Sequence, residues 1–183
     1  LHPSTIQPAV SRNIPVRILN SQRATARGTL ITGERPKTDR PLTAVASKKD
    51  VTVVNITSTR MLMAHGFLRR LFEVFERFKT SVDVVTTSEV SVSVTIDDPR
   101  RLPAIIEELS AFAQVEREDH MAIVCVGGDG LQRDPALASG VLAPIGDVPL
   151  RMLSQAASRR NITFVIRDAE LPAALGRLHD KFF

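Results

Sequence analysis

The sequence predicts an α+β fold in which two ferredoxin-like βαββαβ units lie side by side, preceded by an ordered connecting segment. Three observations predict this fold. The order strand, helix, strand pair, helix recurs after about 70 residues. Apolar residues alternate in some segments and follow helical spacing in others, and 43% of the 183 residues are hydrophobic, which is enough for a packed core. We expect a connector over 1–41, a first unit over 50–119 and a second unit over 120–183.

The first unit begins with the strand VTVVNI (51–56), and a helix of roughly four turns follows. The apolar stripe of this helix consists of Phe67, Leu71, Val74, Phe75 and Phe78. The segments SVDVVTTSEV (81–90) and SVSVTID (91–97) are two further strands. A second helix begins near Pro99, because proline is tolerated in a first helical turn, and the short strand VERED (115–119) closes the unit.

The second unit repeats this order without a final strand. Its predicted elements are the strand 121–127, the helix 136–145, the strands 149–158 and 161–168, and the helix 169–182. One edge of its sheet is therefore open unless another segment fills it. We expect residues 42–49 to supply that strand.

The connector differs in composition from the rest of the chain, because it is rich in proline, arginine and threonine. Within it, IPVRILN and GTLIT are bounded by proline and glycine and predict short strands. We interpret the connector as an ordered loop rather than as a flexible linker.

Composition also narrows the class of protein. The net charge of +4 comes from scattered basic residues, and a single cysteine, Cys125, excludes an intrachain disulfide. No apolar stretch reaches the roughly 18 to 20 residues that span a bilayer, and residues 1–30 lack the layout of a signal peptide. We therefore expect a cytoplasmic protein without a membrane partner.

Residues for catalysis or for metal binding are not recognisable in the sequence. The four histidines lie far apart, and none has the spacing of a metal ligand with a cysteine or a second histidine. The segment GGDG (127–130) lacks the remaining residues of a phosphate-binding loop. We expect no catalytic residue, no metal site and no cofactor in this chain.

Nucleic-acid binding is an alternative, because a ferredoxin-like sheet is also the platform on which RNA-recognition domains stack bases. The predicted central strands carry valine, threonine and serine instead of aromatic residues, and the chain has no tryptophan or tyrosine. The sequence therefore favours no nucleic-acid partner.

The remaining candidate site combines Gly66 with Asp83. A helix predicted to begin after Gly66 leaves backbone N–H groups unpaired, and these favour a carboxylate. We expect Asp83, at the start of the next strand, to lie near the same helix end and to accept hydrogen bonds from an ammonium group. Together they suit an amino-acid zwitterion, although a turn glycine and an exposed edge carboxylate explain the same spacing equally well.

Six segments resemble the C-terminal regulatory region of aspartate kinase, of the lysine-sensitive type, with its tandem ACT domains. They are LHPSTIQPA (1–9), NIPVRILNS (13–21), GTLI (28–31), MLMAHGFLRRLFEVF (61–75), SVDVVTTSEVSVSVTID (81–97) and QAASRRNITFVI (155–166). The segments span almost the whole chain in the family's order.

The resemblance implies that L-lysine binds as a feedback inhibitor between the first ACT units of a homodimer. It implies effector contacts from Met61, Gly66, Phe67 and Leu68, from Ser81, Val82 and Asp83, and from Thr87, Ser88 and Glu89 of the partner. Ala64 and Ala157 depart from the usual serine and glycine, which leaves threonine as the effector, or a role in assembly alone, as alternatives.

The resemblance also implies a longer parent protein. In this family, ATP and Mg bind to a kinase domain upstream of the regulatory region, and we expect that domain to be absent here. The parent would be an aspartate kinase, either alone or fused to diaminopimelate decarboxylase.

Overall fold

The computed structural model describes residues 3–23, 25–33, 42–129, 131, 133–155 and 160–183. The chain divides into two units, Leu1–Asp39 and Arg40–Phe183. The first contains the helix α1 (Pro3–Val10) and the antiparallel strands β1 (Val16–Ile18) and β2 (Thr29–Ile31). Both strands lie within the predicted IPVRILN and GTLIT. The helix was not predicted, because the proline at position 8, inside it, disfavours helix.

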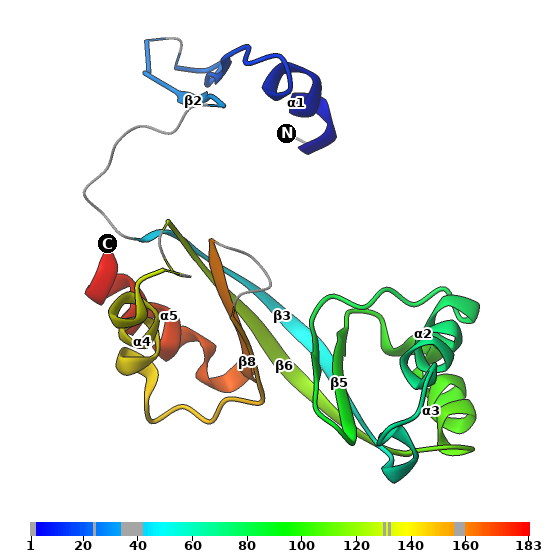
Figure 1. Cartoon of the computed structure of the whole chain (residues 1–183). Coiled ribbons are helices and arrows are strands. Elements are labelled where there is room, and N and C mark those ends of the chain that lie inside the picture. Colours follow the sequence, from blue (N-terminus) through cyan, green and yellow to red (C-terminus); the bar gives the residue numbers. More distant parts are fainter. Residues whose placement is uncertain (1–2, 24, 34–41, 130, 132, 156–159) are drawn as a thin grey trace. The chain divides into compact units, whose positions relative to one another are not determined.

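The unit Arg40–Phe183 is built on one antiparallel sheet of six strands in the order β4-β5-β3-β6-β8-β7 (Figure 1). Its strands are β3 (Leu42–Thr57), β4 (Val85–Thr87), β5 (Ser91–Ile96), β6 (Gln114–Gly128), β7 (Met152–Gln155) and β8 (Asn161–Arg167). Its helices are α2 (Phe67–Arg77), α3 (Leu102–Ser110), α4 (Pro135–Leu142) and α5 (Leu171–Phe182), with short 3₁₀ turns η1 (Thr59–Met61), η2 (Pro99–Arg101), η3 (Ala143–Ile145) and η4 (Asp168–Glu170). The predicted α+β class is confirmed.

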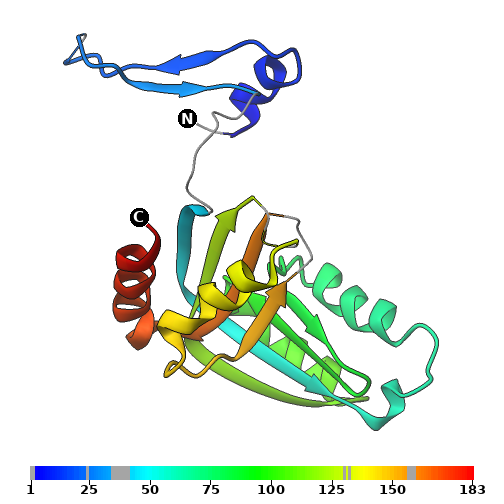
Figure 2. The same cartoon turned by 60° about the vertical axis from the view of Figure 1, so that its left-hand side comes forward.

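The strands β3 and β6 are long enough to belong to both ferredoxin-like halves, as Figure 2 shows. The sequence predicts them as four separate strands, at 42–49, 51–56, 115–119 and 121–127. The structure joins them in pairs, and Leu42 to Lys48 pair with Gly128 to Ile123. The register shifts between Lys48 and Val53, so the strands continue through an irregularity instead of ending there. The boundaries at 50–119 and 120–183 stay a prediction.

Three hydrophobic cores result from alternation along these strands. In β3, Val54 and Ile56 face the core under α2 and α3, whereas Val51 and Val53 face a second core on the other side of the sheet. The third core lies under α4 and α5 and includes Phe164 of β8. Because β3 is buried on both faces in this region, apolar residues occupy the successive positions Val53 and Val54, and the polar Thr52 is itself buried.

The helix α2 is shorter than predicted. It has 11 residues, about three turns, and ends at Arg77 instead of continuing past Phe78. Lys79 has a φ of +51°, and Thr80 N donates to Phe75 O at 2.9 Å, which closes the carboxyl end of the helix. Phe78 still packs against the core from this last turn.

Candidate functional site

The loop before α2 is held in place by Ser58. The buried Ser58 hydroxyl donates to the Phe112 backbone oxygen at 3.0 Å, and the Ser58 backbone N–H donates to the oxygen of Val90 at 2.8 Å. These two bonds tie the start of the loop to the end of α3 and to the turn between β4 and β5. A buried hydroxyl needs such a partner, so the loop position is strongly specified.

Gly66 is the residue directly before α2, and its φ of +83° lies in the left-handed region. Nothing lies within 4 Å of the position that a Cβ would take, so the backbone conformation, and not a lack of space, favours glycine. The first N–H groups of α2 follow it. They carry the partial positive charge of a helix amino end, which suits a carboxylate.

The other predicted residues of this loop and helix differ in exposure. Phe67 packs edge-on against Phe112, with ring centroids 5.7 Å apart, and Met61 also contacts the first core. The Leu68 side chain is exposed. Of these three, Leu68 is therefore the residue that is free to contact a ligand without repacking.

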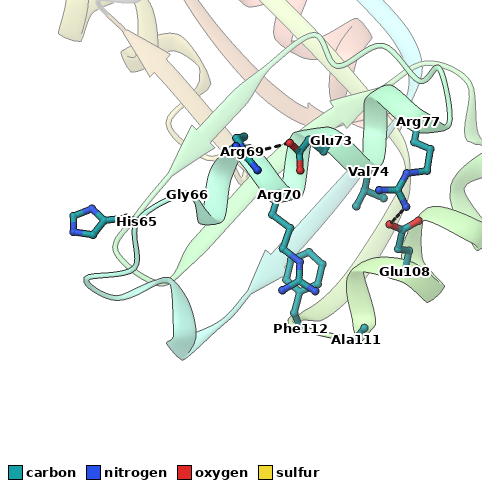
Figure 3. A pocket seen from close by; sticks show the side chains of 10 residues that line it. All are labelled: His65, Gly66, Arg69, Arg70, Glu73, Val74, Arg77, Glu108, Ala111 and Phe112. Carbon is teal, nitrogen blue, oxygen red and sulfur yellow. Dashed lines mark hydrogen bonds and ion pairs between the residues drawn. The ribbon is translucent and has the colours of Figure 1, made fainter.

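A hollow of about 710 Å³ lies between α2 and α3, with Gly66 at its rim (Figure 3). Two ion pairs line it, Arg69 with Glu73 at 3.1 Å and Arg77 with Glu108 at 2.5 Å. The guanidinium of a further arginine, Arg70, lies 4.2 Å from the centre of the Phe112 ring. Three arginines and two glutamates line this hollow, and of the predicted effector residues only Gly66 lines it.

Of the predicted residues, Thr87 ends β4, Ser88 and Glu89 lie in the turn between β4 and β5, and all three are exposed. The hydroxyls of Ser88 and Ser91 are 2.6 Å apart, and Ser88 N–H donates to Ser91 O at 2.8 Å. This turn neighbours the loop before α2 through the bond from Ser58. Glu89 therefore adds negative charge at the same end of the unit as Gly66.

Asp83 lies at the start of the segment that leads into β4, and its carboxylate accepts a hydrogen bond from the Lys48 ammonium at 2.7 Å. The same ammonium is bonded to the carboxylate of Asp97. These bonds, Asp83 first, raise the pKa of Lys48, which therefore stays protonated. Two carboxylates share one ammonium, so the group carries a net charge of −1.

The expectation that Asp83 lies beside the amino end of α2 is wrong within one chain. Asp83 N–H donates to Thr95 O at 3.1 Å, and Thr95 is paired with Val53. Val53 lies five residues before Ser58, which corresponds to about 17 Å of strand, and Ser58 anchors the loop that leads to Gly66. The physical reason is that the chain enters β4 from the carboxyl end of α2, so Asp83 and Gly66 lie towards opposite ends of the unit.

The two residues before Asp83, Ser81 and Val82, lie at the same end of the unit as Asp83. Ser81 is exposed, whereas Val82 is half-buried against the first core. The predicted residues therefore form two groups, one at each end of the unit. Their contacts with an effector stay a prediction.

Sequence reasoning missed Lys48 and Asp97 as partners of Asp83. The sequence assigned Lys48 to a strand of the second ferredoxin-like unit. No prediction therefore placed its side chain beside Asp83, which lies in the first unit. Lys48 lies three residues before Val51 in β3, the strand that crosses from one half to the other, so the continuity of this strand is the signal that could have placed it.

Comparison with known proteins gives three relevant matches. The ACT domain family matches residues 124–182. Aspartokinase 3, chloroplastic, of Arabidopsis thaliana is 40% identical over 100% of this chain and 34% of its own length. The regulatory domain assigned to aspartate kinase in Porphyromonas gingivalis W83 is 35% identical over 76% of this chain and 96% of its own, with a TM-score of 0.69.

This chain belongs to the family of aspartate kinase regulatory regions. It also aligns over its full length with 42% of Escherichia coli aspartokinase III in complex with lysine and aspartate, at 33% identity and a TM-score of 0.87. The predicted resemblance is confirmed. The chain spans about a third of the length of the first curated relatives it matches, between 34% and 36% of each.

No helix in the described part of the chain combines the length and the apolar character that crossing a bilayer requires. A location in the cytoplasm stays a prediction.

Proposed function

We propose that this aspartate kinase regulatory region binds L-lysine and transmits its occupancy to a kinase domain as feedback inhibition. The observation that carries the proposal is the group formed by Asp83, Asp97 and Lys48. It already binds one primary ammonium, that of Lys48, and its remaining charge of −1 can attract a second one. The complex of the Escherichia coli relative with lysine supports the same ligand.

The ligand is proposed to lie between two copies of the chain. Gly66 and Asp83 are separated within one copy by much more than the length of an amino acid. Two copies related by a two-fold axis would bring the amino end of α2 in one beside Asp83 in the other. The helix amides would then face the ligand carboxylate, and Asp83 would face an ammonium group.

Such a site couples binding to assembly. A ligand shifts an equilibrium only by its differential affinity for two states, and typical couplings are about 1–3 kcal/mol. A lysine molecule that contacts both copies stabilises the arrangement in which they meet. That arrangement is the element through which we propose the kinase domain is inhibited.

Titration calorimetry on the 183-residue chain with lysine, threonine, methionine and arginine tests the effector. We expect saturable binding of lysine with micromolar to millimolar Kd, and no comparable heat from the other three. Tighter binding of threonine would replace lysine as the effector. Absence of binding by all four would leave a role in assembly alone.

The RNA-binding alternative is less well supported by the packing. The sheet face opposite the helices carries Val51, Val53, Met121, Ile123 and Val165, and all five side chains are buried against one another. Bases would have to displace this core in order to stack there.

The homodimer is proposed to form along β4. The outer edge of this strand has no partner strand in the described part of the chain, and Val85 on it and Val90 just after it are exposed by 39% and 36%. Met63, in the loop before α2, is 93% exposed. An unpaired strand edge beside exposed apolar side chains is suited to pairing with a second copy.

Placing a lysine at Val85 is expected to dissociate the dimer, because like charges would then meet across the two-fold axis. Light scattering coupled to size exclusion should give a mass near 20.1 kDa for Val85→Lys and about twice that value for the unmodified chain. The matched control is Ile18→Lys, since Ile18 is 41% exposed and lies in β1 of the unit Leu1–Asp39, outside the sheet that contains β4. Dissociation by both substitutions, or by neither, would contradict the role of β4.

A further inference from the structure

Three side chains of types that can ligate a metal ion meet where the two ACT halves join, two from strands and one from the turn after a third strand. They are Asp50 in β3, His120 in β6 and Asp168 directly after β8, and one ligand atom from each lies within 4.8 Å of the other two. His120 Nδ1 is 3.5 Å from Asp50 Oδ1. The backbone N–H of Asp50 lies 3.2 and 3.3 Å from the two carboxylate oxygens of Asp168.

The sheet register brings these side chains together. Met121 is paired with both Val51 and Arg167. Asp50 precedes Val51, His120 precedes Met121 and Asp168 follows Arg167, so the three cluster residues are neighbours in space. Asp50 and His120 both have positive φ, of +55° and +56°, at the irregularity where the long strands pass from one half to the other. The sequence gives no hint of the cluster, because its members are far apart along the chain.

The donor set is chemically specific. One imidazole nitrogen and two carboxylate oxygens suit a borderline divalent ion such as Zn²⁺, with water as the fourth ligand. Mg²⁺ and Ca²⁺ require about six oxygen ligands and are disfavoured by the imidazole. Ligand atoms around tetrahedral zinc lie roughly 3.3 Å apart, so the side chains would have to draw together slightly. The Asp50 and His120 side chains are 82% and 83% exposed, which leaves them free to do so.

We propose that Asp50, His120 and Asp168 form a binding site for a divalent transition metal ion, represented by Zn²⁺, at the junction of the two ACT halves. A bound ion would link β3, β6 and the residue after β8, and so restrain these strands where the register shifts. Its ligands are distinct from Asp83, Asp97 and Lys48, although Lys48 lies two residues before Asp50 in β3.

Calorimetric titration of zinc chloride into the full chain, in a buffer free of phosphate and chelators, tests the site. We expect one ion per chain with micromolar Kd, a rise in Tm with Zn²⁺, and no comparable rise with Mg²⁺. In His120→Asn, zinc binding should weaken at least tenfold and the rise in Tm should disappear. Asparagine is the chosen replacement because it tolerates positive φ.

The matched control is His65→Asn, because His65 is an exposed histidine outside the cluster. It should bind zinc as the unmodified chain does. Equal zinc affinity of His120→Asn and the unmodified chain would overturn the proposal, as would a loss of binding that follows His65. Should His120→Asn fail to fold, Asp168→Asn replaces it, since its amide oxygen still accepts from Asp50 N–H while one carboxylate ligand is lost, and unchanged binding there counts against the site equally.

Discussion

Replacing Asp83 with alanine is expected to weaken lysine binding by at least tenfold while the chain remains folded. In the unmodified chain, Asp83 and Asp97 together exceed the charge of Lys48 by one. Without Asp83 the remaining pair is neutral, and the ligand ammonium loses its acceptor. A hydrogen bond to a charged group contributes about 1.5–3 kcal/mol, and each 1.4 kcal/mol is a factor of about ten in Kd. Calorimetry of the variant with lysine measures the loss directly.

The cost to folding should be small. The Asp83 side chain is 37% exposed and that of Lys48 is 47% exposed, and such ion pairs contribute about 0–1 kcal/mol to stability. The companion variant Asp97→Ala distinguishes the loss of a direct contact with the ligand from the loss of one negative charge. It removes the same charge but not the proposed acceptor, so it should weaken lysine binding less than Asp83→Ala. Unchanged lysine binding in Asp83→Ala would remove Asp83 from the site.

The strands and helices of the ACT halves were predictable because their side-chain patterns are local. The alternation in 91–97 and the helical stripe containing Leu71 and Phe75 each specify one element without reference to the rest of the chain. The continuity of β3 and β6 was not predictable in the same way. The polar segments 47–50 and 116–120 interrupt the apolar pattern, and a polar segment directly before apolar residues is typical of the start of a new strand.

The candidate site was predicted less well, for a topological reason. The sequence prediction selected residue types by their chemistry: an acidic side chain to bind an ammonium group, and the amides at the start of a helix to bind a carboxylate. The structure contains both features. Their relative position depends on the direction in which the chain leaves α2, which spacing alone does not give. The partnership of Asp83 with Lys48 likewise depends on a strand that the sequence assigned to the other half.

Truncating Phe75 to alanine is expected to lower the free energy of unfolding by about 3–5 kcal/mol. Phe75 is 2% exposed and packs in the core between the sheet and helices α2 and α3, so its removal leaves a cavity that cannot collapse fully. Urea denaturation followed by circular dichroism measures the change. The matched control is Phe72→Ala, one turn earlier on the same helix, where the ring is only half-buried and the loss should be smaller.

The shape of the transition carries further information. Since β3 and β6 each run through both ACT halves, and the core of Val53, Met121 and Val165 lies between the halves, disrupting one half removes packing from the other. We therefore expect Phe75→Ala to unfold in a single transition at a lower urea concentration, as should Phe164→Ala in the core under α4 and α5. If Phe75→Ala instead unfolds in two steps, with one half persisting alone, the shared strands do not couple the halves. A single step in both variants would mean that the two shared strands couple the stability of one ACT half to that of the other.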